Sequence, residues 1–298
     1  MAWQSITIIV TALLGIAGSL GAHADDSANP RQAIVFGILP FMSEVSLIKR
    51  FSPLRDHLSA RLHRDVVLET ATDMITFVQR TNEGAYDIVY TAPHFVVLAT
   101  QSGHYSVLAQ PSQKLAAHIM VPADSAVQTV AQLANRRVAS GPALAFLTIV
   151  GKDLLAQAGL KDGSAPEYMI FPNNNSALQA TASGDSDAAI VGTYMIEQAQ
   201  KAGLRELIAT PPYPSVAILA STRLTSQQQN AIGNALVELS STASGQALLE
   251  RIEFPGFQRA NLAEYDTLRR AAELVNKMLH SKTGDPAITR KSEDVKTN

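Results

Sequence analysis

The 298-residue sequence contains no cysteine. This absence excludes disulfide scaffolds, thiolate zinc sites, iron–sulfur clusters, cysteine nucleophiles and a lipid-anchored bacterial N-terminus. The chain also lacks an excess of charge of either sign, because 24 Lys and Arg residues stand against 26 Asp and Glu residues. Binding to nucleic acid needs a basic surface, so we expect no nucleic-acid partner. With 46% hydrophobic and 17% charged residues, the sequence predicts a protein that folds around an ordinary hydrophobic core.

The sequence also lacks the short motifs that mark many active sites and metal centres. It contains no G-x-S-x-G, no H-E-x-x-H and no G-x-G-x-x-G. Gly151-Lys152 resembles the end of a phosphate-binding loop, but Phe146 and Asp153 break that motif at two positions. The seven histidines show no spacing typical of metal ligands. We therefore expect no enzyme activity, no cofactor and no bound metal.

One long apolar run is present, at the start of the chain. Residues 6–20 carry no charge, and Ala22-His23-Ala24 then forms an A-x-A cleavage pattern before two aspartates. This segment predicts a signal peptide over residues 1–24 that is cleaved after Ala24. Residues 1–5 carry no Lys or Arg, which leaves an uncleaved anchor as the alternative, but the run is shorter than the roughly 20 residues of a spanning helix. We expect an exported protein, and the missing lipid-anchor cysteine favours a Gram-negative periplasm.

Beyond residue 32, short β-rich runs alternate with amphipathic helical stretches. Strands are expected at 33–39, 65–70, 86–90, 105–109, 137–140, 167–171, 187–191, 204–209 and 216–220. Helices are expected at 46–62, 73–80, 92–102, 124–134, 143–158, 176–183, 194–201, 226–249 and 262–279. Pro53 lies inside the first helix and leaves open a start at that residue. The alternation predicts an α/β fold with largely parallel sheets.

The pattern is interrupted at two places. It restarts at residues 115–121, and Pro211-Pro212-Tyr213-Pro214 breaks it before the last strand. We therefore expect two lobes joined by crossover strands at 115–121 and 211–220. Lobe 1 takes residues 32–114 plus 215–279, and lobe 2 takes residues 122–210. Residues 280–298 are polar and lack periodicity, so we expect a disordered tail, and no internal repeat of fixed period is visible.

A series of short segments resembles the phosphonate-binding branch of the type 2 periplasmic binding proteins of ABC importers. The matching segments, in order, are 36–40 (FGILP), 71–73 (ATD), 84–89 (GAYDIV), 92–95 (APHF), 133–139 (LANRRVA), 183–189 (SGDSDAA), 255–257 (PGF) and 264–266 (EYD). The resemblance implies a two-lobe fold, each lobe a mixed, mostly parallel sheet flanked by helices. It also implies that the lobes close on a small ligand and present it to a membrane permease. We expect the protein to be a monomer.

Three positions depart from the pattern of that family. Ala145-Phe146-Leu147-Thr148 stand where phosphonate binders carry a Ser-Thr-Ser-Gly run, Asn174 stands in place of a histidine, and Met74 stands in place of an aromatic residue. The hydroxyl groups that would surround a phosphonate are therefore missing. The expected ligand is a phosphate-like or phosphonate-like anion, or another oxyanion, held by backbone N–H groups at helix N-termini.

Twelve candidate ligand-binding residues lie mainly where strands end and helices begin, which is where open α/β sheets bind ligands. They are Phe41, Thr72, Asp73, Thr91, His94, Ser140, Gly141, Asn174, Asn175, Ser176, Thr193 and Tyr213. We expect His94 and Asn174 to contact the same ligand from opposite lobes, with Thr91 and Thr193 as flanking donors.

Each candidate also has a purely structural interpretation. Thr72, Asp73, Thr91 and one residue of 173–176 have the residue types that cap helices. His94 fits a surface helix position, and Ser140-Gly141 fit a turn. Phe41 and Tyr213 are as consistent with packing as with ligand contact. These alternatives stay open at the level of the sequence.

The pattern as a whole predicts the solute-binding component of an ABC importer. A periplasmic sensor that reports a bound ligand to a membrane kinase, chemoreceptor or cyclase is the alternative. Such a sensor would use the same fold and the same kind of pocket, so the sequence leaves both open.

Overall fold

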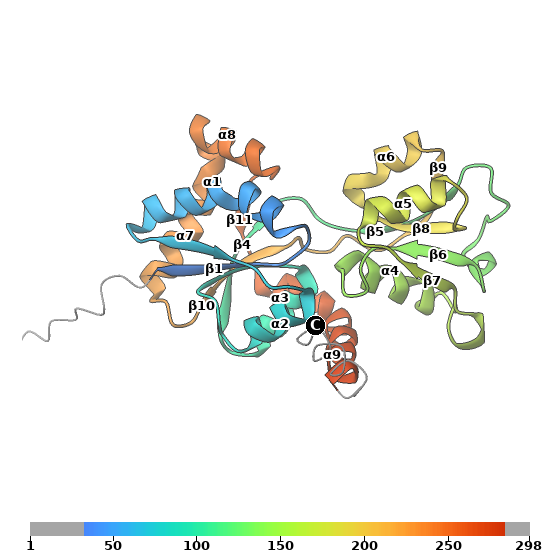
Figure 1. Cartoon of the computed structure of the whole chain (residues 1–298), viewed down its shortest axis with the longest axis horizontal. Helices are drawn as coiled ribbons and strands as arrows, with labels where there is room; N and C mark the ends of the chain where they lie inside the picture. Colours follow the sequence, from blue (N-terminus) through green and yellow to red (C-terminus); the bar gives the residue numbers. More distant parts are fainter. Residues whose placement is uncertain (1–32, 284–298) are drawn as a thin grey trace, which may run out of the picture. The chain divides into compact units, whose positions relative to one another are not determined.

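The computed structural model describes residues 33–283 of the chain. The predicted signal peptide with its cleavage site, and residues 284–298 of the predicted tail, lie outside this range. The described chain forms two mixed β-sheets with flanking helices (Figure 1). We call the part built on the first sheet lobe 1 and the part built on the second sheet lobe 2.

Lobe 1 contains a six-stranded sheet with the order β11-β4-β10-β3-β1-β2. Its strands are β1 (Ile34–Ile38), β2 (Val66–Glu69), β3 (Ile88–Thr91), β4 (Tyr105–Pro111), β10 (Ala217–Ser221) and β11 (Phe257–Arg259). Its helices include α1 (Glu44–Leu62), α2 (Met74–Asn82), α3 (Pro93–Gln101), α7 (Ser226–Val237) and α8 (Ala243–Ile252).

Side chains alternate between the two faces of this sheet and thereby build two hydrophobic layers. In β3, Ile88 and Tyr90 pack in one cluster with α1, α7 and α8, whereas Val89 packs in another cluster with α2 and α3. In Figure 1, α1 and α8 accordingly lie on one side of the sheet and α2 and α3 on the other. The strands of the centre are buried on both faces and read as continuous apolar runs, which is why the sequence shows them clearly.

Lobe 2 contains a five-stranded sheet with the order β7-β6-β8-β5-β9. Its strands are β5 (Ala117–Pro122), β6 (Arg137–Ser140), β7 (Glu167–Ile170), β8 (Ala188–Gly192) and β9 (Leu204–Ala209). Its helices are α4 (Phe146–Gln157), α5 (Asn174–Ala182) and α6 (Ile196–Lys201), with α5 and α6 on one face of the sheet and α4 on the other (Figure 1).

The α/β fold with two mixed sheets is as expected, but the expectation of mostly parallel pairing is wrong. Three of the five strand pairs in lobe 1 are antiparallel. Two of the four strand pairs in lobe 2 are antiparallel as well. The reason is that β5 and β10 are the first strands that the chain forms after it crosses from one lobe to the other. Each runs antiparallel to both of its neighbours.

The chain passes between the lobes at residues 112–116 and 210–216, between β4 and β5 and between β9 and β10. Leu115 and Tyr213 form an isolated antiparallel bridge between the two passages, with N···O distances of 3.0 and 2.7 Å. Of the expected crossovers, residues 117–121 lie in β5 and residues 217–220 lie in β10. The connecting segments are therefore shorter than the sequence indicated.

Both lobes use the same succession of elements, although the sequence shows no repeat. β1-α1-β2-α2-β3 in lobe 1 corresponds to β6-α4-β7-α5-β8 in lobe 2. α2 and α5 each have nine residues, start at the caps Asp73 and Asn173, and are followed by Gly84 and Gly184 with φ of 74° and 85°. The first helices differ in length, with 19 residues in α1 and 12 in α4, so the repeat has no fixed period.

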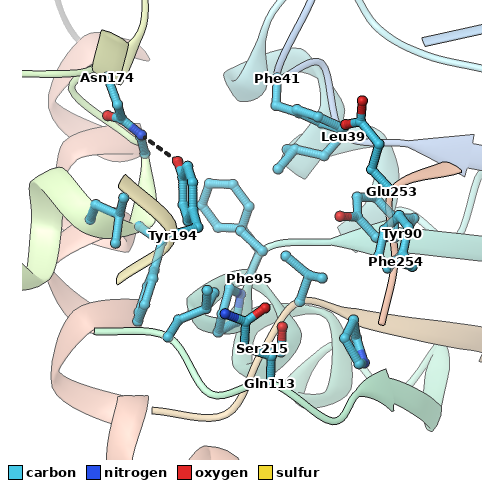
Figure 2. Close-up of a pocket in the computed structure, with 18 of the residues that line it drawn as sticks. Leu39, Phe41, Tyr90, Phe95, Gln113, Asn174, Tyr194, Ser215, Glu253 and Phe254 are labelled. Carbon is cyan, nitrogen blue, oxygen red and sulfur yellow. Dashed lines mark hydrogen bonds between the residues drawn. The ribbon is translucent and has the colours of Figure 1, made fainter. Parts of the chain in front are cut away.

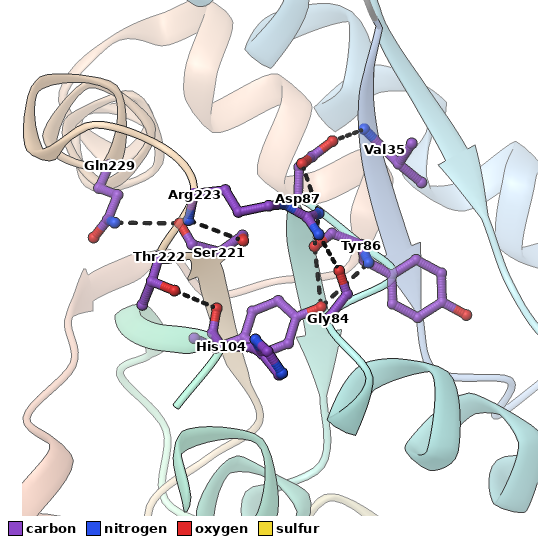
Figure 3. Close-up of polar contacts among 10 residues, drawn as sticks. Val35, Gly84, Tyr86, Asp87, His104, Ser221, Thr222, Arg223 and Gln229 are labelled. Atoms are coloured by element: carbon purple, nitrogen blue, oxygen red, sulfur yellow. Dashed lines mark hydrogen bonds and ion pairs between the residues drawn. The ribbon is translucent and has the colours of Figure 1, made fainter. Parts of the chain in front are cut away.

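An aspartate at the start of the third strand of each lobe holds the neighbouring strand. Asp87 accepts a hydrogen bond from the Val35 N–H at 2.9 Å and pairs with Arg223 at 3.1 Å (Figure 3). Asp187 accepts a hydrogen bond from the Arg137 N–H at 2.8 Å in the same way. Asp87 thus joins β3 to β1, and Asp187 joins β8 to β6. Both contacts lie at the end of the sheet that is opposite to the N-termini of α3 and α4.

Two of the expected helices are interrupted or absent. Residues 124–134 contain only a 3-10 turn at Val130–Leu133. The expected helix 226–249 is divided into α7 and α8, because Thr242 accepts a hydrogen bond from the Gly245 N–H at 3.0 Å and caps a new helix.

The C-terminal part also differs from the expectation. The expected run of helices after residue 220 contains the short strand β11, which pairs with β4. The expected helix 262–279 begins as a 3-10 helix, Leu262–Leu268, and continues as α9 (Arg269–Thr283). The tail predicted from residue 280 therefore begins too early. α9 packs against α3 and α4, and Arg270 binds Asp153 at 2.7 Å.

Helix α1 begins at Glu44 and continues through Pro53. Ser43 caps it by accepting a hydrogen bond from the Ser46 N–H at 3.3 Å. The proline lacks one backbone donor, but buried residues on both sides of it, Phe51 and Leu54 among them, hold the helix against the sheet. The alternative start at Pro53 is therefore wrong.

Candidate functional site

A cavity of about 470 Å³ is lined by residues of both lobes (Figure 2). From lobe 1 it takes the residues after β1, the start of α3 and the segment after α8. From lobe 2 it takes the start of α4, the start of α5 and Tyr194, which follows β8. The site therefore lies where strands lead into helices, as expected for an α/β sheet.

Two helix N-termini in the cavity wall have no side-chain cap. Ala92 precedes α3 and Ala145 precedes α4, and neither carries a hydrogen-bonding side chain. By contrast, Ser43, Asp73, Asn173, Thr225 and Thr242 cap α1, α2, α5, α7 and α8. The first N–H groups of a helix have no partner within it and lie at the positive end of the dipole, so the start of α4 offers the N–H groups of residues 146–148 as hydrogen-bond donors. The start of α3 offers only the His94 N–H, because Pro93 has no N–H and the Phe95 N–H donates to the Ala92 carbonyl at 3.0 Å.

The start of α4 presents apolar side chains to the cavity. Leu144, Ala145, Phe146 and Leu147 all line it. The nearby Thr148 is buried, and its hydroxyl donates to the Gly141 carbonyl at 3.2 Å. The hydroxyl groups that the sequence lacks at this helix start are thus not replaced by another residue of the same segment.

The start of α5 brings Asn174 into the cavity. Its Nδ2 donates a hydrogen bond to the hydroxyl of Tyr194 at 3.2 Å (Figure 2). A Cβ at Gly141 would lie 2.1 Å from Asn174 Oδ1, so a glycine is needed there for this close approach. A Cβ at Gly192 would lie 2.5 Å from the Tyr194 ring. Two glycines at strand ends therefore fix the lobe 2 wall.

The lobe 1 wall combines aromatic rings with one compensated cation. Arg50 forms an ion pair with Glu253 at 3.0 Å and donates to the Ile252 carbonyl at 2.8 Å. Its guanidinium lies 5.9 Å from the centre of the Phe41 ring and 5.6 Å from that of Phe254. Arg50 and Glu253 are the charged residues of the lining, so the described wall carries no net charge.

Tyr90 anchors this aromatic wall. Its ring lies 6.0 Å from that of Phe41, 5.0 Å from that of Phe51 and 5.8 Å from that of Phe254, measured between ring centres. Burial raises the pKa of Tyr90 far above its usual value, so the side chain stays neutral. Tyr90 therefore contributes a closely packed, neutral ring to this wall.

His94 lies behind the cavity rather than in its lining. The ring is fully buried, its Nε2 lies 3.1 Å from the Leu144 carbonyl, and its centre is 5.6 Å from that of Phe146. Burial lowers the pKa of His94 to about 3, although the hydrogen bond to Leu144 opposes that shift. A neutral His94 thus joins α3 of lobe 1 to the start of α4 in lobe 2.

The flanking candidates Thr91 and Thr193 also lie outside the lining. Thr91 is fully buried and its hydroxyl has no hydrogen-bond partner within the described chain. The Thr193 hydroxyl accepts a hydrogen bond from the Ala116 N–H and lies 3.1 Å from His118 Nε2. Thr193 therefore holds the crossover against lobe 2. Ser140, at the end of β6, is buried like Thr91 and its hydroxyl is similarly unpartnered among the described residues.

The remaining candidates serve caps and crossovers. Asp73 caps α2 and Asn173 caps α5, as the structural interpretation of these segments predicted, whereas Ala92 rather than Thr91 occupies the cap position of α3. Thr72 donates to Asp73. Burial alone would raise the pKa of Asp73, but the hydrogen bonds from Thr76 and Thr72 outweigh it and lower the pKa.

Ser176 donates both its N–H and its hydroxyl to Asn173 Oδ1. Asn175 accepts a hydrogen bond from Gln198 at 2.6 Å. Tyr213 forms the bridge between the crossovers, and its ring packs edge-on against Phe146 with 5.6 Å between ring centres. Of the twelve candidates, Phe41 and Asn174 line the cavity.

The sequence did not single out most of the residues that form the walls. These residues include Arg50, Tyr90, Phe95, Phe146, Leu147, Tyr194, Glu253 and Phe254. Phe95 and Phe146 carried a usable signal, because each is within the first turns of a helix that follows a strand. Arg50 and Phe254 had none, because Arg50 lies inside α1 and Phe254 lies in the segment after α8.

Within residues 33–283, no group of three or more His, Asp or Glu residues is placed to hold a metal ion. None of the helices in this part of the chain is long and apolar enough to cross a membrane.

The fold is similar to those of several solved binding proteins. A protein of Xanthomonas citri solved with chloride is 16% identical, with a TM-score of 0.72, over 83% of this chain and 99% of its own. PhnD1 of Prochlorococcus marinus, solved with methylphosphonate, is 19% identical, with a TM-score of 0.70, over 84% and 100%. A binding-protein component of a phosphonate ABC transporter from Pseudomonas aeruginosa is 17% identical, with a TM-score of 0.64, over 89% and 95%.

These similarities establish the two-lobe periplasmic binding protein fold. The model of one protein family, described as the periplasmic substrate-binding protein of phosphonate ABC transporters, matches residues 36–265. This match spans most of the chain and covers both sheets. The chain therefore belongs to the phosphonate family of periplasmic substrate-binding proteins of ABC transporters.

Proposed function

We propose that the protein binds a small oxyanion in the cavity between its lobes and delivers it to the permease of an ABC importer. The head of the ligand accepts hydrogen bonds from the backbone N–H groups at the starts of α3 and α4. Asn174 contacts it from lobe 2, and Phe41 closes the lobe 1 side. The crossovers at Leu115 and Tyr213 act as the hinge about which the lobes close.

The observation that carries this proposal is the pair of uncapped helix starts in one cavity wall. Side chains cap α1, α2, α5, α7 and α8, whereas α3, α4 and the six-residue α6 have no side-chain cap, and α3 and α4 begin in the cavity wall. Backbone N–H groups at a helix start bind anions without a charged side chain. This arrangement is consistent with a lining in which the Arg50 charge is already paired with Glu253.

A ligand screen tests the proposal. Melting temperatures are measured with phosphate, phosphite, phosphonates, sulfonates, carboxylates and amino acids. A ligand present at 100 times its dissociation constant adds about 2.7 kcal/mol to the free energy of unfolding, which is easily seen as a melting shift. Stabilisation by one class of oxyanion supports the proposal. Stabilisation by amino acids alone, or by no compound, contradicts it.

Calorimetry on two neighbouring asparagines then locates the site. Asn174 lines the cavity, whereas Asn175 is exposed and lies outside the lining. A lost hydrogen bond to a charged group costs about 1.5–3 kcal/mol, so Asn174→Ala weakens binding roughly 10- to 150-fold. Asn175→Ala is the matched control and keeps the affinity of the wild type. Equal affinity in wild type and Asn174→Ala would place the ligand elsewhere.

We also propose that the protein works in the periplasm after cleavage behind Ala24. The only tryptophan of the chain is Trp3, within the predicted signal peptide. Protein recovered from the periplasm of a Gram-negative host is therefore expected to start at Asp25 and to show no tryptophan fluorescence. An intact mass that includes Met1, or tryptophan emission, would contradict the cleavage.

A further inference from the structure

Aromatic residues are concentrated in the cavity wall. The whole chain has nine Phe, seven Tyr and one Trp. Six of these residues line the cavity: Phe41, Tyr90, Phe95, Phe146, Tyr194 and Phe254. A site for a bare tetrahedral oxyanion needs polar donors, so this apolar and aromatic wall points to another part of the ligand.

Two of these rings are exposed and lie on opposite walls. Tyr194 of lobe 2 is 61% exposed and Phe41 of lobe 1 is 37% exposed, and both border the open space of the cavity (Figure 2). Each is held in place from behind. Tyr194 rests on Gly192 and bonds Asn174, and Phe41 rests on Tyr90. Two fixed, exposed rings in one cavity leave apolar surface that a ligand can bury.

The charges of the lining favour the same conclusion. The Arg50 guanidinium is 3.0 Å from Glu253 and is also bound to the Ile252 carbonyl. A small anion that enters the cavity would therefore lose its hydration. In exchange it would gain hydrogen bonds from backbone N–H groups, but the described lining offers it no unpaired cationic side chain. Additional binding energy has to come from apolar contact.

We propose that the ligand is an oxyanion that carries an aromatic ring, with the ring bound between Phe41 and Tyr194. The oxyanion then occupies the uncapped starts of α3 and α4, so the inference rests on the proposed function. A ring is favoured over a flexible chain because the exposed partners are themselves aromatic, and paired rings interact beyond the area that they bury.

Three compounds that share the phosphonate group separate the effect of burying a ring from the effect of ring stacking. Calorimetry is carried out with methyl-, cyclohexyl- and phenylphosphonate. Burial of a ring the size of a phenylalanine side chain predicts that phenylphosphonate binds about 10- to 150-fold more tightly than methylphosphonate. Ring stacking predicts a further preference of roughly 2- to 10-fold over cyclohexylphosphonate. Equal affinity for all three, or a preference for methylphosphonate, overturns the inference and leaves the proposed function standing.

Substitutions assign the preference to the two rings. Tyr194→Leu and Phe41→Leu are expected to reduce phenylphosphonate affinity several-fold more than they reduce methylphosphonate affinity. Tyr194→Phe keeps the ring and the preference. Ile170→Leu is the matched control, because Ile170 is 47% exposed on β7 and lies outside the lining. Equal losses for both phosphonates in the two leucine variants overturn the assignment. Benzyl alcohol binding as tightly as phenylphosphonate overturns the role of the oxyanion, and with it the proposed function.

Discussion

The buried His94 predicts that the protein loses stability as the pH falls from 6.5. In the unfolded chain the ring takes up a proton near its ordinary pKa of 6.5, whereas burial lowers the pKa of the folded protein to about 3. Between these values the unfolded state binds one proton more than the folded state. Stability therefore rises with pH across this window and is lost as the pH falls.

The size of the effect follows from the width of the window. Each pH unit below 6.5 costs about 1.4 kcal/mol, so the folded state loses about 2 kcal/mol between pH 6.5 and pH 5. For a chain of this size, that loss lowers the melting temperature by about 4–8 °C. Protonation would place the added proton on Nδ1, which is buried without a hydrogen-bond partner among the described residues, while the Nε2 bond to the Leu144 carbonyl can be kept.

The assay compares wild type with His94→Gln, which keeps a hydrogen-bond donor but does not titrate. Melting temperatures are measured from pH 7 to pH 5 in the same ionic strength. All other titrating groups contribute equally to both proteins, so they cancel in the difference. The account predicts that wild type loses stability relative to the variant as the pH falls. A difference that stays constant across this range would refute the reasoning.

Three further predictions concern the framework around the site. Asp87→Ala leaves the Val35 N–H without its acceptor and Arg223 without its partner (Figure 3), and we expect a loss of about 1–3 kcal/mol in urea unfolding with unchanged ligand affinity. Gly141→Ala forces Asn174 out of its position, and calorimetry should show weaker ligand binding together with about 1–3 kcal/mol of destabilisation. Asp73→Ala removes the cap of α2, at a cost of about 1 kcal/mol in urea unfolding at pH 7. Because the pKa of Asp73 is lowered, its contribution is present above pH 3.8 and the difference from wild type should vanish as the pH falls through the folded pKa. Unchanged urea midpoints in Asp87→Ala or Asp73→Ala, or normal ligand affinity in Gly141→Ala, would contradict these roles.

The sequence was sufficient for the elements whose signal is local. Strand 204–209 is marked by a glycine directly before it and by prolines soon after it, and the observed bounds agree with the expected ones. Helix caps such as Asp73 were identified because their chemistry acts on the next few residues. The two-lobe α/β fold followed from the order of these elements, whereas the bounds of the crossovers did not.

Features that depend on contacts between distant parts of the chain were harder to predict from the sequence. The strand β11 has three residues and exists because β4 offers an edge, so no local pattern marks it. The direction of β5 and β10 depends on how the chain returns to each sheet, which the sequence does not express.

The cavity shows the same division. The positions where strands lead into helices indicated the region of the cavity, and the candidates Phe41 and Asn174 line the cavity. His94 is polar and begins a helix, yet it packs inward because the Leu144 carbonyl of lobe 2 meets its ring. Arg50 and Phe254 both line the cavity, although about 200 positions separate them in the sequence. The cation–π contact between them forms only when the chain folds. The sequence patterns therefore did not predict which side chains at a helix start point into the cavity and which pack inward.

A crystal structure of the protein with phenylphosphonate is the measurement that tests the central claim most directly. The account predicts that the phosphonate oxygens lie within hydrogen-bond distance of N–H groups at the starts of α3 and α4. It also predicts that the ring lies between Phe41 and Tyr194 and that Asn174 contacts the ligand. A phosphonate bound outside this cavity, or held there by side-chain cations alone, would contradict the account.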